Sequence, residues 1–231
     1  MRSVEPFPPT IMPLETIELH PPGETKASII IMHGLGADGT DFLSFGDQLD
    51  LSEAGPVRYV LPRAPVRPVT INGGYKMRAW YDILGTQIDR REDEAGLRES
   101  MAEVRMLIDR ERARGIAANR IVLGGFSQGC AMALLTGLRY PERLGGLLCM
   151  SGYLPLAERT EAERTPANAD VPIFLAHGKR DAVIPLDRAA ASRDQLARLG
   201  YSVQWHEYPM EHSVCMEEIE EINAWLLTLL R

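Results

Sequence analysis

One stretch of the sequence, residues 121–133, constrains the fold of this chain more than any other. An apolar run rich in β-branched residues leads into a Gly-Phe-Ser-Gln-Gly segment, and small and apolar residues then continue at helical spacing. This order predicts a strand, a sharp turn and a helix. Gly125 and Gly129 flank Ser127 in the pattern G-x-S-x-G, in which residues without side chains let strand and helix approach closely. Ser127 is therefore a candidate nucleophile; the alternative is a serine that only caps the helix.

Composition indicates one globular domain of the α/β class that spans residues 1–231. The chain is 45% hydrophobic and 25% charged, which is typical of soluble proteins of this size. Its net charge of −7 lacks the basic excess that nucleic-acid binding requires. No apolar run reaches the roughly 18 residues of a membrane span. Residues 1–13 are rich in proline, so we expect an extended segment without the apolar core of a signal peptide, and a cytoplasmic protein.

Cysteine and histidine spacing predicts neither a metal site nor a cofactor. The three cysteines, Cys130, Cys149 and Cys215, include no C-x-x-C pair, so buried free thiols are expected. The five histidines form no i,i+4 or H-x-H cluster of the kind that holds a metal ion. We therefore expect chemistry that needs only the side chains and backbone of the chain.

Strand-like and helix-like segments alternate along the sequence. Residues 27–32 form a continuous apolar run, which is typical of a strand covered on both faces in a parallel sheet. Residues 97–108 show apolar positions at helical spacing, and similar patterns follow toward the C-terminus. The alternation predicts a doubly wound, mostly parallel sheet with helices on both faces. Residues 62–79, rich in proline, glycine and arginine, are predicted to be a long loop.

The loop after the first apolar strand has two interpretations. Residues 34–39 match G-x-G-x-x-G, which occurs in dinucleotide-binding folds. That fingerprint also requires an acidic residue at the end of the second strand, whereas Glu53 lies before the next strand, residues 57–61. In the other interpretation, Gly34 and Gly36 let the backbone bend so that the Leu35 N–H points into a cleft as an oxyanion donor. His33 would then brace the loop.

Partners for Ser127 follow at the ends of later strands. Asp181 and His212 complete the order Ser, Asp, His, which is the order of the α/β-hydrolases. A serine hydroxyl is a weak nucleophile at neutral pH, so an imidazole must take its proton. A carboxylate fixes the tautomer of that imidazole and compensates its transient charge. We therefore predict a triad of Ser127, His212 and Asp181.

Other residues compete for these roles. His177 also falls at a strand end, but a base there would precede the acid in the chain. His20 and His206 are expected to be structural or exposed, and Asp187 and Asp170 are weaker candidates for the acid because one enters a helix and the other precedes its strand.

These segments together resemble a known family. The loop at residues 33–36, the turn around Ser127, the segment 181–185 and the pair His212 and Ser213 are similar to the small bacterial carboxylesterase, lysophospholipase and acyl-protein thioesterase family of α/β-hydrolases. The resemblance covers nearly the whole chain and implies Ser127, Asp181 and His212 as catalytic residues. It also implies the backbone N–H groups of Leu35 and Gln128 as the oxyanion hole. Family members commonly have glycine before the histidine, where this chain has Glu211.

The resemblance implies hydrolysis of small-molecule or lipid acyl esters by a monomer or homodimer without a large cap domain. We favour a serine carboxylesterase; the alternatives are a lysophospholipase, an acyl-protein thioesterase, or a non-catalytic binding module on the same fold. An open apolar groove is expected between residues 62–84 and 151–170, with Trp80 and Leu84 contacting the substrate. For Trp80, packing in the core is an equal alternative.

Overall fold

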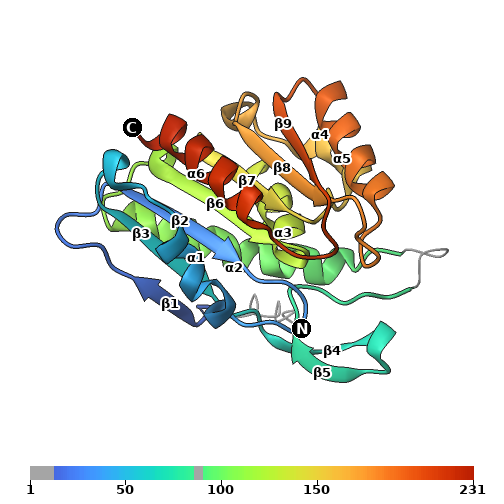
Figure 1. Ribbon diagram of the computed structural model, residues 1–231. Helices are drawn as coiled ribbons and strands as arrows, with labels where there is room; N and C mark the ends of the chain where they lie inside the picture. The colour runs from blue at the N-terminus through green and yellow to red at the C-terminus, as the bar shows by residue number, and fades with distance from the viewer. Residues whose placement is uncertain (1–12, 86–90) are drawn as a thin grey trace, which may run out of the picture.

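A seven-stranded sheet forms the centre of the molecule (Figure 1). The computed structural model describes residues 13–85 and 91–231; the predicted extended segment, except Pro13, lies outside the described residues. The strand order is β1-β3-β2-β6-β7-β8-β9, and within the described residues every pairing in this sheet is parallel except that of β1 with β3. The strands are β1 (Thr16–Leu19), β2 (Ala27–Met32), β3 (Val57–Pro62), β6 (Ile121–Phe126), β7 (Gly146–Met150), β8 (Ile173–Gly178) and β9 (Val203–Tyr208).

Helices cover both faces of the sheet, and the apolar strands are buried from both sides. In β2, Ile30 and Met32 join a core cluster that includes residues of α2, α3 and α5. Ile29 and Ile31 point the other way and join a cluster with residues of α1 and α6. This two-sided burial confirms the predicted mostly parallel sheet with helices on both faces. The helices are α1 (Leu43–Gln48), α2 (Glu94–Ala113), α3 (Gln128–Gly137), α4 (Ala157–Glu163), α5 (Leu186–Arg198) and α6 (Met216–Leu230).

None of the helices in the described part of the chain combines the length and the apolar character needed to cross a bilayer. The cysteines are free, as predicted: Cys130 and Cys149 are buried, and Cys215 is partly buried.

The prediction of a loop over residues 62–79 was wrong in part. The segment contains an antiparallel hairpin of β4 (Val66–Val69) and β5 (Tyr75–Arg78), which lies outside the main sheet (Figure 1). Gly73 and Gly74 at its turn have positive φ. Val66 and Tyr75 are exposed, and the segment shows no clear apolar alternation in the sequence. Backbone hydrogen bonds between the two segments define these strands, and the pattern of side chains in the sequence does not indicate such bonds.

Candidate active site

The turn after β6 holds Ser127 where strand and helix nearly collide. A Cβ atom at Gly129 would lie 2.0 Å from the carbonyl oxygen of Met32, and one at Gly125 would lie 2.3 Å from the backbone of Gly129. Both positions therefore require glycine. Ser127 has φ +56° and ψ −117°, a conformation that L-residues rarely adopt and that costs of order 1–3 kcal/mol. Its side chain makes no hydrogen bond to cap α3, so the capping alternative does not explain this serine.

Two backbone N–H groups beside Ser127 have no hydrogen-bond acceptor among the described residues. They belong to Leu35, in the loop after β2, and to Gln128, the first residue of α3. The N–H of Gln128 is one of the four at a helix N-terminus that no helical carbonyl can reach. Both residues line a cavity together with Ser127. They are therefore free to donate to a negatively charged oxygen placed beside Ser127.

The side chains of Gln128 and Trp80 make hydrogen bonds that hold the two loops with the free N–H groups in place. Gln128 Oε1 accepts from the N–H of Trp80 at 3.0 Å, and its Nε2 donates to the carbonyl of Tyr81 at 3.0 Å. Trp80 Nε1 donates to the carbonyl of His33 at 2.9 Å. These bonds connect the segment after β5 to both loops that carry the free N–H groups.

His33 braces the Leu35 loop through both ring nitrogens. Nδ1 lies 2.7 Å from the carbonyl oxygen of Gly34, and Nε2 lies 3.0 Å from the N–H of Ala64. This pair of partners fits a neutral ring that donates from Nδ1 and accepts at Nε2. Burial lowers the pKa of His33, which keeps the ring neutral. The loop continues into a short 3-10 turn, Gly39–Phe42, and not into the long helix that a dinucleotide fingerprint opens.

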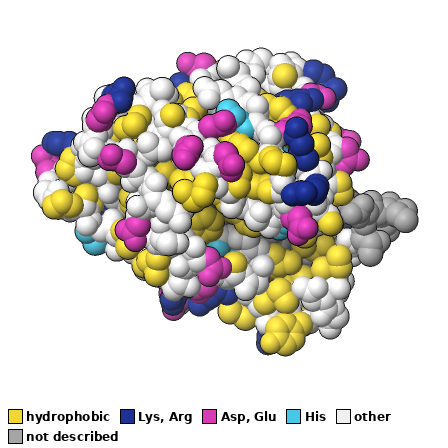
Figure 2. All heavy atoms as spheres, viewed as in Figure 1, with side chains coloured by type: hydrophobic (Ala, Val, Ile, Leu, Met, Phe, Trp, Pro, Cys, Tyr) yellow, Lys and Arg dark blue, Asp and Glu magenta, His cyan; other side chains and the backbone are white. Residues whose placement is uncertain are grey.

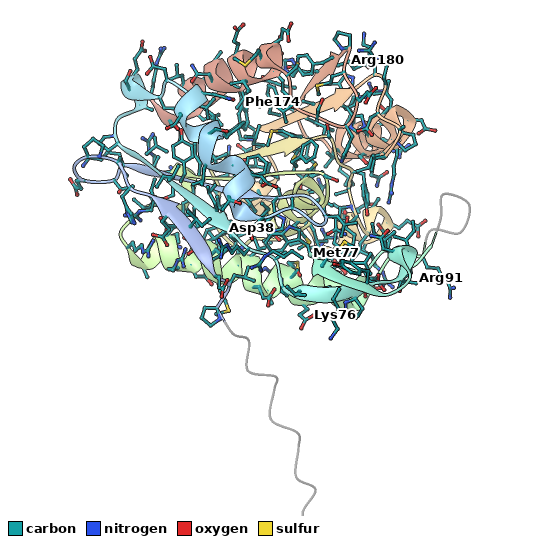
Figure 3. All side chains as sticks on the ribbon, turned by 60° about the horizontal axis from the view of Figure 1, so that its bottom comes forward. Asp38, Lys76, Met77, Arg91, Phe174 and Arg180 are labelled. Atoms are coloured by element: carbon teal, nitrogen blue, oxygen red, sulfur yellow. The ribbon has the colours of Figure 1, made fainter. Side chains whose placement is uncertain are left out.

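Asp38 anchors the far end of the same loop. Its carboxylate pairs with Arg63 Nε at 3.1 Å and with Arg78 Nε at 2.8 Å, at the base of the hairpin. The N–H of Gly36 donates to the carbonyl of Arg78 at 2.8 Å. Figure 3 labels Asp38 together with Lys76 and Met77, which belong to the hairpin. The Leu35 loop is therefore held at both ends and along its length.

Asp181 and His212 meet at the ends of β8 and β9. His212 Nδ1 lies 2.6 Å from Asp181 Oδ2, a short contact typical of a charge-assisted hydrogen bond. Asp181 Oδ1 accepts from the N–H groups of Val183 and Ile184, each at 2.8 Å. One oxygen of the carboxylate therefore holds the loop after β8 in place, and the other orients the imidazole. With Nδ1 donating to Asp181, Nε2 of His212 remains free as a proton acceptor.

The competing histidines differ from His212 in their partners, although His177 Nε2 also lies 3.4 Å from Asp181 Oδ2. His177 is fully buried, and its Nε2 lies 2.7 Å from the carbonyl oxygen of Ile184, which occupies that nitrogen. Burial also lowers the pKa of His177. His206 stacks on Phe174 and pairs with Glu221, and His20 is exposed beside Glu18. Of the competing acids, Asp170 pairs with Arg143 at 2.8 Å, and Asp187 lies in the first turn of α5.

Glu211, where family members commonly have glycine, fits the backbone without strain. Within the described chain, the residues other than glycine with positive φ are Ser127, Ser151 and Leu156, so Glu211 does not adopt the left-handed conformation that would require glycine. Its side chain is exposed, and its carbonyl accepts from the N–H of Ser213 at 2.9 Å. The departure from the family pattern leaves the loop of His212 intact.

Two cavities meet at Ser127. The larger, of about 740 Å³, lies between α1 and the start of α6 and includes His212 in its wall. The smaller, of about 280 Å³, includes Gln128. Leu35, Ser127 and Val183 line both. Figure 2 shows the face that carries α1 and α6, where hydrophobic side chains gather around a hollow and acidic side chains lie around them.

Ser127 and His212 line the larger cavity together. In the part of the chain that the structure describes, no hydrogen bond joins their side chains, a situation common in hydrolases without substrate. Phe126 packs on the imidazole, with ring centroids 4.7 Å apart. Ser127 therefore shares the larger cavity with the imidazole and the smaller cavity with Gln128, and Leu35 lines both.

Trp80 and Leu84, the two predicted substrate contacts, do not line either of these two cavities. Trp80 is fully buried and is not among the residues that line these two cavities, so its position is that of the packing alternative. Leu84 is 39% exposed, and its neighbours Ile83 and Gly85 line the smaller cavity instead.

Tyr81 and Tyr153 line the smaller cavity and fall within the two segments, 62–84 and 151–170, that were predicted to shape a groove. Two basic residues of this cavity, Arg91 and Arg188, were not identified from the sequence. Phe42 and Phe45, which line the larger cavity, lie in a turn and a short helix that had no distinct pattern.

Comparison with known proteins places the chain in a family. A family model described as phospholipase/carboxylesterase matches residues 16–230. Acyl-protein thioesterase 1 of Yarrowia lipolytica is 38% identical over 205 residues, which are 87% of this chain and 90% of that protein. Acyl-protein thioesterase 1 of Gibberella zeae is 40% identical over 210 residues, with 87% and 89% covered.

Solved structures agree. Acyl-protein thioesterase 2 of Zea mays superposes with a TM-score of 0.83 at 32% identity and covers 94% of this chain and 99% of its own. Esterase PE8 superposes with a TM-score of 0.82 at 28% identity and covers 94% and 100%. These likenesses indicate an enzyme rather than a binding module, and specifically a serine hydrolase of the carboxylesterase type. The chain belongs to the phospholipase/carboxylesterase family of α/β-hydrolases.

Proposed function

We propose that the protein hydrolyses carboxylic acyl esters through an acyl-enzyme on Ser127, with His212 as general base and Asp181 as its orienting acid. The single observation that carries this proposal is the 2.6 Å contact of His212 Nδ1 with Asp181 Oδ2, on an imidazole that lines one cavity with Ser127. Ser127 attacks the acyl carbonyl while His212 takes its proton, and His212 then returns that proton to the departing group.

The negative charge of the tetrahedral intermediate falls on the carbonyl oxygen, and the N–H groups of Leu35 and Gln128 would receive it. One such donor contributes about 3 kcal/mol to lowering the barrier. Water activated by His212 then releases the acid and restores Ser127.

The two cavities divide the substrate between them. Because the imidazole must reach both Ser127 Oγ and the departing atom, the leaving group belongs on the His212 side, in the larger cavity. The acyl chain then extends toward the smaller cavity, which includes Gln128 and no part of His212. We refer to these as the leaving-group cavity and the acyl cavity.

Thioesters form a second candidate substrate class. Two of the relatives in the comparison are acyl-protein thioesterases by name, and a thiolate is a better leaving group than an alkoxide in the same two-step reaction. The wide leaving-group cavity, about 740 Å³, is consistent with a large thiol-bearing group.

A fluorophosphonate probe and an ester assay test the proposal. We expect the probe to label the native protein at Ser127 and p-nitrophenyl butanoate to be hydrolysed. Ser127→Ala should lose both, with kcat reduced on the order of 10⁶-fold and the thermal unfolding temperature retained. Hydrolysis by Ser127→Ala at the native rate would refute the assignment, and acyl thioesters offered beside the matched oxygen esters decide between the two substrate classes.

A further inference from the structure

Two residues line both the acyl cavity and a second cavity next to it. This outer cavity, of about 300 Å³, is lined by residues of α4 and α5 such as Ala157 and Gln195. Among the described residues, Tyr153 and Arg188 are the two that line both cavities. The partition between the cavities is therefore built from these two residues.

The tyrosine half of this partition is rigid. Tyr153 is 8% exposed, and its hydroxyl lies 2.8 Å from that of Tyr81, which is buried as well. The next residue, Leu154, donates its N–H to Ser192 Oγ at 2.9 Å, and Ser192 donates to the carbonyl of Arg188 at 2.9 Å. The turn that carries Tyr153 is thereby fastened to the first turns of α5.

The arginine half is held by stacking. The Arg188 guanidinium carbon lies 3.3 Å from the centroid of the Tyr153 ring, a cation–π contact. No carboxylate among the described residues lies within 4.0 Å of this guanidinium, so no ion pair with them fixes it. A long side chain that rests on an aromatic face therefore separates the two cavities.

We propose that Arg188, stacked on Tyr153, limits the length of the acyl chain that the enzyme accepts. The inference rests on the proposed function and deepens it. The acyl cavity, of about 280 Å³, ends at this partition, so a chain too long for it must displace the guanidinium from the ring. Removing the arginine side chain joins the outer cavity to the acyl cavity.

The test is the ratio of kcat/KM for p-nitrophenyl dodecanoate to that for the butanoate, measured within each protein below the solubility limit of the esters. We expect Arg188→Ala to raise this ratio about tenfold over the native protein, which corresponds to the burial of one to two further methylene groups at about fourfold each. Arg188→Met should stay closer to the native ratio than Arg188→Ala, because methionine is shorter than arginine but fills much more of the partition than alanine, without the charge. A ratio within a protein is insensitive to a general loss of activity.

Arg193 provides the matched control on the same helix. Its guanidinium lies 5.0 Å from the centroid of the Trp205 ring, and it lines none of these cavities. Arg193→Ala removes an equivalent arginine and should leave the ratio unchanged.

Three outcomes overturn the inference. If Arg188→Ala keeps the native ratio while Ser127 still takes the fluorophosphonate, the partition does not set chain length and the proposed function stands. If Arg188→Met changes the ratio as much as Arg188→Ala, charge and not volume selects the chain. If the native protein neither reacts with the probe nor hydrolyses any ester, the proposed function fails and the inference fails with it.

Discussion

The two cavities at Ser127 differ in size and in what builds them. The leaving-group cavity is wide and lies against α1 and the start of α6, whose exposed residues, such as Ser44 and Met216, form its rim. The acyl cavity is small and is lined by Tyr81, Tyr153 and the first turn of α5. A wide cavity discriminates little between occupants, whereas a small one discriminates by shape. The enzyme is therefore expected to be tolerant of the leaving group and selective for the acyl chain.

The largest expected effect in this comparison comes from changing Asp181, the acid that orients His212 on the leaving-group side. Asp181→Asn should lower kcat for p-nitrophenyl butanoate by about 10⁴-fold, because an amide facing His212 Nδ1 stabilises the wrong tautomer. The amide oxygen can still accept from the N–H groups of Val183 and Ile184, so the thermal unfolding temperature should change little. A loss smaller than tenfold would remove Asp181 from the mechanism.

The next effect falls on the oxyanion donor of the acyl side. In Gly129→Ala the new methyl group collides with the carbonyl of Met32, which displaces the start of α3 and the N–H of Gln128. We expect kcat per folded enzyme to fall by about 10² to 10³-fold. Gly137→Ala, on the same helix, is the matched control: there the collision is with the flexible end of the Leu147 side chain, so stability should fall while kcat is retained. Equal kcat for both variants would contradict this account.

A smaller effect separates the two cavities directly. Ser44 is an exposed residue of α1 that lines the leaving-group cavity. Ser44→Trp should lower kcat/KM for esters of bulky alcohols about tenfold relative to methyl esters. The preference for acyl chain length should not change, because Ser44 does not line the acyl cavity. A simultaneous change in both preferences would show that the division of the substrate is wrong.

The smallest effect concerns stability beneath the leaving-group cavity. Glu218, in the first turn of α6, is fully buried, and its carboxyl oxygens have no hydrogen-bond partner among the described residues. Burial raises the pKa of Glu218 to about 8. Between about pH 4.5 and pH 8 the folded state therefore binds more protons than the unfolded state, and the stability contributed by the protonated carboxyl is lost as the pH rises.

Glu218→Gln removes this dependence. We expect the difference in unfolding temperature between this variant and the native protein, measured by circular dichroism, to increase by roughly 5 °C in favour of the variant from pH 5 to pH 8. The adjacent and exposed Glu217 gives the control, and Glu217→Gln should run parallel to the native protein. Parallel curves for Glu218→Gln would show that its carboxyl is already ionised at neutral pH.

The turn around Ser127 and the strands of the sheet were predictable because local sequence causes them. Glycine at positions 125 and 129 is demanded by contacts within a few ångströms, and the β2 run is apolar because both faces are covered. The pairing of Asp181 with His212 was also predicted, since residues at the carboxyl ends of parallel strands gather at one edge.

The hairpin of β4 and β5, the burial of Trp80 and the partition by Tyr153 and Arg188 were not predictable in the same way. From the sequence, Trp80 could equally well line a pocket or pack in the core. Its burial and the hydrogen bond from its ring N–H to the carbonyl of His33 place it in the core. Arg188 lies in the first turn of a helix with an ordinary sequence. Nothing near it in the chain indicates that its guanidinium packs on a tyrosine 35 positions earlier.

The sequence by itself determined the sheet, the turn that strains Ser127 and the order of the residues that accompany it, because steric demands and strand burial act over a few neighbouring residues. Only the tertiary structure decided how the space around the serine is divided and which side chains line each part. Those features depend on contacts between distant segments, and such contacts leave no period or motif in the chain.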